Sequence, residues 1–261
     1  MQKLENWTVA YKSMSKLYIL EFESRWEEGE RTANGISTYI SSKFPKVKRI
    51  LDIPCGNGRL SLPLGKRGFH VLGIDSSEPF IVDARERLAG FSSINVQFEK
   101  GDTRDLSTIV GHFDADVIIN WWTSIGYVSK SEDIKFFHDL WNLSKRKTVL
   151  FLETWHRNYI ISNPLRYRYG ELGNRICTVI ENKFDRSARF VLSEHKYYKK
   201  VGGDLKLIGK FKSKIMLYSA DELIDMLKSA GWEVLDKFNS IENTKSFDLS
   251  KDRIVLVAVK E

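Results

Sequence analysis

Two glycines and an aspartate form the pattern in this sequence that points most directly to chemistry. Gly56 and Gly58 stand in a short turn after an apolar run that begins at Ile50, and Asp75 ends a second apolar run. Glycine has no Cβ atom, so the backbone of the turn can bend sharply and approach a ligand closely. Asp75 follows the turn by roughly 20 residues, a spacing at which a carboxylate can bind two ribose hydroxyls. The pattern predicts a site for an adenosyl ligand; the alternative is a turn that serves only chain geometry.

The glycine spacing differs from that of two common nucleotide sites. A dinucleotide-binding turn has the pattern G-x-G-x-x-G, but the next glycine after Gly58 is Gly65. The Lys-Ser/Thr pair of a phosphate-binding P-loop is also absent. Three elements are predicted to position the glycine turn and Asp75. They are a buried strand from residue 50, a helix over about 60–66 and a strand over about 71–74. The free N–H groups at the start of that helix then face the turn.

Further candidate residues follow the next two expected strands. Asp102 comes after a strand over 95–99 and is placed either to accept a hydrogen bond from an adenine amino group or to cap a turn. A fourth strand over 115–120 leads into a polar and aromatic segment over 121–127. Ligands of an open parallel sheet bind outside the carboxyl ends of its strands. We therefore expect this segment on the same rim as the glycine turn.

The end of a fifth strand, over 148–152, supplies the remaining candidates. His156 is a possible proton acceptor, and Tyr127 is placed to orient a bound substrate; an ordinary loop histidine and a packing tyrosine are the alternatives. Arg157 is a candidate for binding an acidic substrate together with the arginines of 166–169, a run that equally fits a solvated stretch. Aromatic side chains such as Trp155 favour a cation over their faces.

Two segments lie outside this strand and helix pattern. Residues 1–44 are amphipathic and expected to be helical, and they precede the first strand, so they can cover the open edge of the site as a lid. Trp7, Tyr11 and Trp26 belong either to the core or to this lid. Residues 159–214 contain short strands separated by polar turns, which predicts an antiparallel insertion.

The chain closes with a helix and two short strands. Ser219 is expected to begin a helix over 220–230, followed by strands over 233–235 and 253–258. An earlier helix, over 132–143, is expected to have Ser131 as its cap.

Composition and charge limit the class of protein. The length of 261 residues favours one large α/β domain with an insertion, and a hydrophobic content of 42% is enough for a core. The net charge of +7 suits binding to nucleic acid, to an anionic substrate or to an acidic partner, or simply a solvated basic face.

No apolar run approaches the roughly 18 residues of a membrane span, and residues 1–5 lack a signal core, so we expect a cytoplasmic protein. Cys55 and Cys177 alone form neither a disulfide framework nor a zinc site, and no metal is expected.

The chain resembles class I S-adenosylmethionine (SAM)-dependent methyltransferases, within the subgroup of glycine, sarcosine and amino-sugar N-methyltransferases. Pro54 departs from the glycine of many relatives, but proline also occurs there in related sequences. The resemblance implies an α/β fold: a Rossmann-like seven-stranded class I sheet, an antiparallel β insertion and an N-terminal helical segment in a single domain over 1–261. The stretches that carry it are 51–59, 73–77, 101–106, 120–127, 217–223 and 230–232.

The resemblance also implies roles for individual residues. Asp75 and Ser76 would bind the ribose of SAM, and Asp102 and Thr103 would meet its adenine. The remaining cofactor residues, at the methionine end and the sulfonium side, would be Asp52, Cys55, Gly56, Asn57, Gly58, Asn120 and Trp121. The acceptor would contact Trp122, Tyr127, Trp155 and Arg157, with Tyr127 and His156 as the catalytic candidates.

The predicted function is methyl transfer from SAM to a small molecule, with nitrogen as the favoured atom. One alternative is an RNA or protein methyltransferase that grips its partner with the basic insertion. Against methylation of a nucleobase amine, Asn120 is followed by Trp121 and Trp122 rather than by an Asn-Pro-Pro-aromatic run. Another alternative is a non-catalytic SAM-binding protein. Nucleic acid is not favoured as a partner, no membrane is expected, and the protein would be a monomer or a homodimer.

Overall fold

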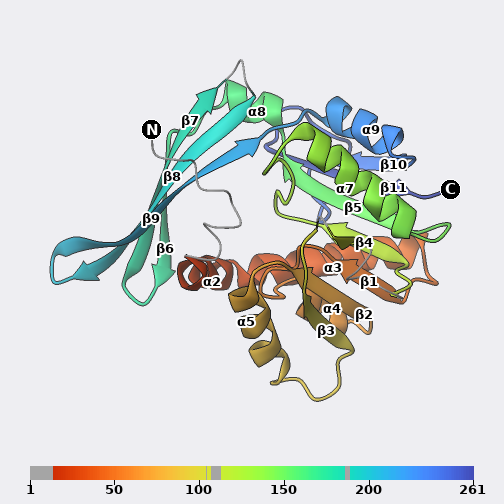
Figure 1. Cartoon of the computed structure of the whole chain (residues 1–261), viewed down its shortest axis with the longest axis horizontal. Coiled ribbons are helices and arrows are strands. Elements are labelled where there is room, and N and C mark those ends of the chain that lie inside the picture. The colour runs from red at the N-terminus through yellow and green to blue at the C-terminus, as the bar shows by residue number, and fades with distance from the viewer. Residues whose placement is uncertain (1–13, 104, 107–112, 186–188) are drawn as a thin grey trace.

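The computed structural model describes residues 14–103, 105–106, 113–185 and 189–261. The chain forms a seven-stranded sheet in the order β10-β11-β5-β4-β1-β2-β3 and a separate four-stranded sheet in the order β6-β7-β8-β9 (Figure 1). The strands of the larger sheet are β1 (Arg49–Asp52), β2 (His70–Asp75), β3 (Val96–Lys100), β4 (Val117–Asn120), β5 (Val149–Trp155), β10 (Glu233–Phe238) and β11 (Arg253–Val259).

Strands β1 to β5 are parallel, whereas β11 is antiparallel to both β5 and β10. The chain leaves β1 toward β2 on one side and later returns to β4 on the other. The order of the strands therefore reverses at β1, and a ligand crevice is expected outside the carboxyl ends of β1 and β4. The predicted Rossmann-like class I sheet is confirmed.

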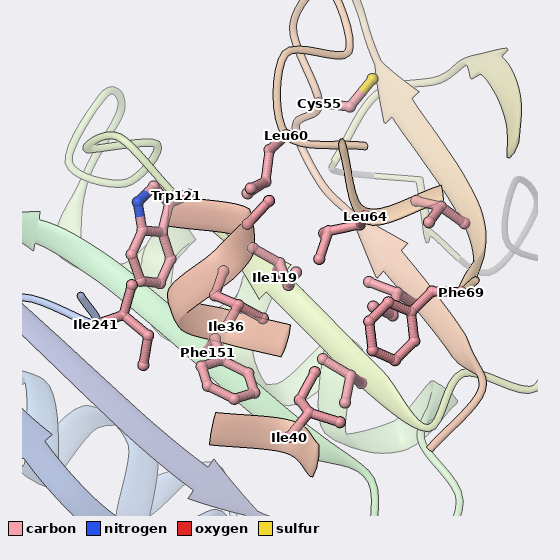
Figure 2. Packing of buried hydrophobic residues seen from close by; sticks show 14 of the residues in the cluster. Ile36, Ile40, Cys55, Leu60, Leu64, Phe69, Ile119, Trp121, Phe151 and Ile241 are labelled. Carbon is pink, nitrogen blue, oxygen red and sulfur yellow. The ribbon is translucent and has the colours of Figure 1, made fainter. Parts of the chain in front are cut away.

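The helices of the described chain are α2 (Ser15–Ser24), α3 (Trp26–Lys43), α4 (Ser61–Lys66), α5 (Glu78–Leu88), α7 (Lys130–Leu143), α8 (Arg157–Ser162) and α9 (Ala220–Ser229). Some of them cover the two faces of the larger sheet. On one face, Ile36 and Ile40 of α3 belong to the same buried cluster as Phe151 of β5 (Figure 2). On the other face, Phe137 of α7 and Leu223 of α9 are fully buried in a second cluster. The strands are hydrophobic on both sides because both faces are covered.

The smaller sheet is antiparallel throughout, as predicted for the insertion. It consists of β6 (Tyr167–Gly173), β7 (Ile176–Asp185), β8 (Phe190–Val201) and β9 (Asp204–Met216). Helix α2 packs between β6 and α5 (Figure 1). Its Tyr18 is buried in a third cluster with Phe80 of α5 and Phe211 of β9. This cluster joins the smaller sheet to the larger one.

Several expected elements differ from the observed ones. Strand β6 and helix α8 were not expected. Helix α7 is capped by Ser129, whose hydroxyl accepts a hydrogen bond from the amide of Glu132, and not by Ser131. Ser219 does cap α9 as predicted, in a reciprocal capping box with Glu222.

The N-terminal prediction is tested only in part. Residues 15–24 and 26–43 are helical, and Trp26 packs against the main core. Trp7 and Tyr11 lie outside the described residues. No helix in the described part of the chain is long and apolar enough to span a membrane.

Candidate functional site

The glycine turn holds the Asp75 carboxylate through backbone amides. Gly56 and Gly58 have positive φ angles of 55° and 80°, which glycine adopts without strain. The amide of Gly56 donates to Asp75 Oδ2 and the amide of Ser77 donates to Oδ1, both at 2.9 Å. Each carboxylate oxygen can accept a further hydrogen bond. This arrangement suits two neighbouring hydroxyls, such as those of a ribose.

Burial shapes the protonation of this carboxyl group. Asp75 is almost fully buried, and burial raises its pKa to about 6 against the opposing effect of the amide hydrogen bonds. At neutral pH the group is mostly ionised and acts as an acceptor for both hydroxyls.

A pocket opens beside this turn, which we call the glycine-turn pocket. Eight of the predicted cofactor residues line it: Cys55, Gly56, Asn57, Asp75, Ser76, Asp102, Thr103 and Trp121. Aromatic side chains from other elements complete its wall, namely Phe22 of α2, Phe80 of α5, Trp122, Tyr127 and Phe136. The structure therefore brings together residues from the ends of β1, β2, β3 and β4, as expected for a ligand at the carboxyl edge of the sheet.

Three predicted cofactor residues do not line this pocket. The Asp52 carboxylate accepts a hydrogen bond of 2.5 Å from the Ser61 hydroxyl, and burial raises the pKa of Asp52 to about 7. Asn120 donates from Nδ2 to the carbonyl of Ile53 at 2.9 Å, which ties β4 to the segment after β1.

Gly58 has a packing role instead of a lining role. A Cβ atom at this position would lie 2.6 Å from Cζ of Phe98. Like Asp52 and Asn120, Gly58 thus contributes to the shape of the turn, and its predicted contact with the cofactor has no support from the pocket geometry.

The segment after β4 is strained and anchored by a glutamate. Trp122 and Thr123 have φ angles of 55° and 59°, which are uncommon for residues with side chains. The amide of Trp122 donates to Glu153 Oε2 at 2.8 Å, and the amide of Thr123 donates to the carbonyl of Glu153 at 3.2 Å. Glu153 is itself paired with Arg253 at 2.9 Å. These bonds hold the Trp122 indole at the rim of the pocket.

A second pocket lies between the smaller sheet and the rim of the larger one, and we call it the inter-sheet pocket. Its wall comes from α2, from all four strands of the smaller sheet, and from Trp155 and Arg253. Trp122 and Tyr127 line both this pocket and the glycine-turn pocket. Three of the four residues predicted to bind the acceptor, Trp122, Tyr127 and Trp155, therefore lie together.

His156 and Arg157 lie elsewhere. His156 is fully buried, with Nδ1 3.2 Å from the carbonyl of Lys251 and its ring edge-on to Phe247. Arg157 pairs with Glu222 at the start of α9. Neither residue is among those that line the two pockets. This placement argues against the roles predicted for them, because the end of β5 turns away from the pockets directly after Trp155.

The sequence analysis did not single out Glu21, His195 and Arg253, which line the inter-sheet pocket. Arg168, which also lines it, belongs to the run over 166–169 that was a candidate for binding an acidic acceptor. Along β6, Tyr167, Tyr169 and Glu171 are exposed while Arg168 and Leu172 are more buried, an alternation typical of a strand with one covered face. The others come from α2, β8 and β11, and no local pattern indicates that these elements meet.

Comparison with known proteins agrees with the fold. Residues 50–147 match the family model described as a methyltransferase domain. The "Putative methyltransferase YqeM" of Bacillus subtilis (strain 168) is 32% identical over 125 residues, which are 48% of this chain and 49% of that protein. The match thus spans about half the length of this relative.

Solved methyltransferases share the architecture of almost the whole chain. The CcbJ methyltransferase of Streptomyces caelestis has a TM-score of 0.74 and 21% identity over 89% of each chain. SAM-bound CalS10, an amino pentose methyltransferase of Micromonospora echinaspora, has a TM-score of 0.71 and 17% identity over 94% of this chain and 97% of its own. The chain has the class I methyltransferase fold, and residues 50–147 within it match the methyltransferase domain model. The predicted resemblance to SAM-dependent methyltransferases is confirmed.

Proposed function

We propose that the protein is a SAM-dependent methyltransferase whose small-molecule acceptor binds in the inter-sheet pocket. The observation that carries this proposal is the pair Trp122 and Tyr127, which lines both pockets. A cofactor in one pocket and an acceptor in the other would meet at these two aromatic residues. Holding two reactants in line at close range can supply roughly 7–11 kcal/mol of a reaction barrier.

The residues of the glycine-turn pocket fit SAM. Asp75 has a free acceptor position on each oxygen for the ribose hydroxyls. Asn57 Oδ1 is buried and has no hydrogen-bond partner among the described residues, so it is available to the amino group at the methionine end. When bound, SAM supplies a methyl carbon on a sulfonium sulfur, which keeps the electron pair of the broken C–S bond. The rings of Trp121, Trp122 and Tyr127 favour a cation of this kind.

Nitrogen is the favoured acceptor atom in this proposal. An amine must lose a proton to expose its lone pair, and Glu21 offers a carboxylate in the inter-sheet pocket. Burial raises the pKa of Glu21, and the Tyr197 hydroxyl donates a hydrogen bond to its Oε1. A carboxylate with a raised pKa is a better proton acceptor than an exposed one. The similarity to CalS10, an amino pentose methyltransferase, also supports an amine.

The two segments expected around the sheet acquire roles in the same proposal. The insertion over 159–214 would cover the acceptor, because all four of its strands contribute to the inter-sheet pocket. The N-terminal segment over 1–44 would act as a lid, because Phe22 of α2 lines the glycine-turn pocket while Tyr18 and Glu21 line the other.

Thermal unfolding with SAM and with S-adenosylhomocysteine tests the cofactor site. Ligand binding to the native state raises stability by about 2.7 kcal/mol at 100 times the Kd. We expect the melting temperature of the parent and of Asp225→Ala, an exposed position on α9, to rise with either ligand, and that of Asp75→Ala to stay unchanged. No rise in the parent at saturating ligand would overturn the proposal.

Turnover distinguishes an enzyme from a SAM-binding regulator. Release of S-adenosylhomocysteine is measured with amines, alcohols and carboxylic acids as acceptors, with RNA as a further arm. Turnover of amines alone supports small-molecule N-methylation. Salt-sensitive turnover of RNA, or tight SAM binding without any turnover, would contradict it.

A further inference from the structure

The hairpin formed by β8 and β9 ends in an exposed segment, residues 199–210, which we call the hairpin tip. Figure 1 shows this hairpin extending away from the seven-stranded sheet. The two strands are joined by the turn Gly202–Gly203, since Val201 lies opposite Asp204. Every residue over 201–208 is exposed. The described part of the chain therefore leaves this end of the hairpin uncovered.

The hairpin tip carries a cluster of aliphatic side chains. Val201, Leu205, Leu207 and Ile208 are 52%, 53%, 45% and 40% exposed. They are four of the twelve large hydrophobic residues that are exposed in the described part of the chain, and all four lie within 201–208. Single exposed hydrophobic residues are normal in proteins, but a contiguous group of them marks a contact surface.

Apolar side chains occur on both faces of the tip. Side chains alternate along a strand, so Val201 lies on one face together with Asp204, and Leu205 and Leu207 lie on the other. A protein partner that docks on one face of a hairpin leaves the other face in water. Insertion into the apolar layer of a bilayer covers both faces at once.

Lysines flank the apolar cluster and lie opposite one another. Lys199 is directly opposite Lys206, and Lys196 is directly opposite Lys210, across β8 and β9. Like charges at directly opposite positions destabilise a pair of strands. Lys199, Lys206 and Lys210 form no ion pair with the part of the chain that the structure describes. An anionic surface would relieve this repulsion.

The spacing of these residues fits the depth of a bilayer interface. Val201 and Leu205 lie within two residues of the turn, or about 7 Å along a strand, and surface-bound apolar groups enter a bilayer by about 5–10 Å. Lys199 and Lys206 lie three residues from the turn, at about 10 Å. With the turn inserted, their ammonium groups would therefore reach the level of the lipid headgroups.

The composition of the tip argues against two other kinds of partner. Bases of single-stranded nucleic acid stack on aromatic side chains, whereas the apolar residues over 199–210 are all aliphatic. Protein–protein interfaces are depleted in lysine and enriched in aromatic residues and arginine, which is the reverse of this segment.

We propose that the hairpin tip binds the surface of an anionic lipid bilayer, with Val201 and Leu205 below the headgroups and Lys199 and Lys206 against the headgroup phosphates. This contact goes beyond the proposed methyltransferase function and does not depend on it. No membrane partner was expected from the sequence, because no apolar run could span a bilayer, but a surface contact needs only a short apolar tip.

Flotation of the full chain with lipid vesicles is the first test. The vesicles contain phosphatidylcholine alone or mixed with phosphatidylglycerol, which is anionic. Leu205→Asp is compared with Leu235→Asp, which adds the same charge at an exposed leucine of β10. We expect the parent and Leu235→Asp to bind the anionic vesicles, and Leu205→Asp to bind them at least about tenfold more weakly. Equal binding of the two variants, or no binding of the parent, would overturn the inference.

A pair of double variants tests the lysines in the same assay. Lys199→Gln/Lys206→Gln is compared with Lys46→Gln/Lys228→Gln, which removes two exposed lysines elsewhere. The first should weaken vesicle binding by about fivefold for each lysine, and the second should change it much less. An unchanged melting temperature shows that each variant is folded. Equal weakening in both would indicate a general effect of net charge and contradict the assigned surface.

A fluorescent label distinguishes the bilayer from other partners. Cys55 and Cys177 are buried, so Leu205→Cys can be labelled selectively with nitrobenzoxadiazole. Its emission should brighten and shift to shorter wavelength with anionic vesicles, whereas the label in Leu235→Cys should not respond. A response at position 205 to single-stranded RNA, or to rising protein concentration without lipid, in place of the response to vesicles would assign the tip to nucleic acid or to a second copy of the chain. Either result would overturn the inference.

Discussion

The guanidinium group of Arg59 lies over the indole ring of Trp122, with Cζ 3.4 Å from the ring centroid. The two residues come from different parts of the chain, since Arg59 follows the glycine turn and Trp122 follows β4. The ring of Phe22 on α2 lies near the same guanidinium, at 5.3 Å. Arg59 therefore joins three walls of the glycine-turn pocket. Burial lowers its pKa to about 9, against the opposing effect of the Glu28 carboxylate, which lies 3.9 Å away.

Replacing Arg59 separates the effect of its packing from that of its charge. Arg59→Met keeps much of the contact with Trp122 and removes a buried charge, so we expect the free energy of unfolding to change by less than about 1 kcal/mol. Arg59→Ala leaves the space between Phe22 and Trp122 empty and should cost about 2–5 kcal/mol. Urea unfolding measures both. A methionine variant as unstable as the alanine variant would show that the charge is required.

The pH dependence of SAM binding should report on Asp75. Its pKa is raised to about 6, so the carboxylate takes up a proton as the pH falls below this value. Protonation removes an acceptor for the ribose, and hydrogen bonds to a charged group contribute about 1.5–3 kcal/mol. We expect the Kd for SAM to rise by up to about tenfold between pH 7 and pH 5, as measured by calorimetry, because the ionised fraction of Asp75 falls by about that factor. Asp75→Asn should bind weakly at both pH values, whereas an unchanged Kd in the parent would rule out this contact.

The close contact of Gly58 with Phe98 predicts a specific loss of stability. Gly58→Ala places a residue with a Cβ at a φ of 80°, which costs about 1–2 kcal/mol, and forces that Cβ to within 2.6 Å of Phe98 Cζ. Gly68 is the matched control, because its φ is 88° but no atom lies within 4 Å of a Cβ there. We expect Gly58→Ala to lower the free energy of unfolding by at least about 1 kcal/mol more than Gly68→Ala.

A second substitution tests the origin of that difference. In the Phe98→Leu background the ring is removed, so the extra cost of Gly58→Ala should shrink toward that of Gly68→Ala. Equal losses for both glycines in the parent would show that backbone strain alone restricts position 58.

The predictable part of the site is the part encoded locally. Asp75 and the glycine turn are close in sequence, and a helix and a strand that connect them in a parallel sheet can have few arrangements. The contact between Asp75 and the turn therefore follows from the order of strand, turn, helix and strand. Trp122 and Tyr127 were placed on the correct rim for the same reason, because the carboxyl ends of parallel strands share one edge.

The unpredictable part depends on contacts between distant segments. Glu21 meets Arg168 only because α2 packs against β6, and Arg253 reaches the rim because β11 pairs with β5. His156, in contrast, was predicted to lie at the site but lies outside both pockets. It immediately follows Trp155, but the isolated bridge between His156 and Tyr218 draws the chain away from the pocket, a long-range pairing that no local pattern contains.

The carboxyl group of Asp133 should make stability depend on pH. Its Oδ2 accepts hydrogen bonds from the Tyr218 hydroxyl and from the amide of Gly126, and burial raises its pKa from 3.8 to about 6. Between about pH 4 and pH 6 the folded protein holds more protons at this group than the unfolded chain does. The free energy of unfolding must therefore fall as the pH rises through this window, by up to about 3 kcal/mol at 1.36 kcal/mol per pKa unit.

Asp133→Asn tests this contribution, since an amide oxygen can accept the same hydrogen bonds without ionising. We expect urea unfolding of this variant to lose less stability between pH 4 and pH 7 than the parent. The matched control is Asp139→Asn on the same helix, where the carboxylate pairs with Lys135 at 2.5 Å and is more exposed. If both variants lose as much free energy of unfolding between pH 4 and pH 7 as the parent does, the charged form of Asp133 is not disfavoured in the folded state. A smaller slope in Asp133→Asn alone would establish that this buried carboxyl group, which fixes the segment carrying Tyr127 to α7, is stabilised by its proton.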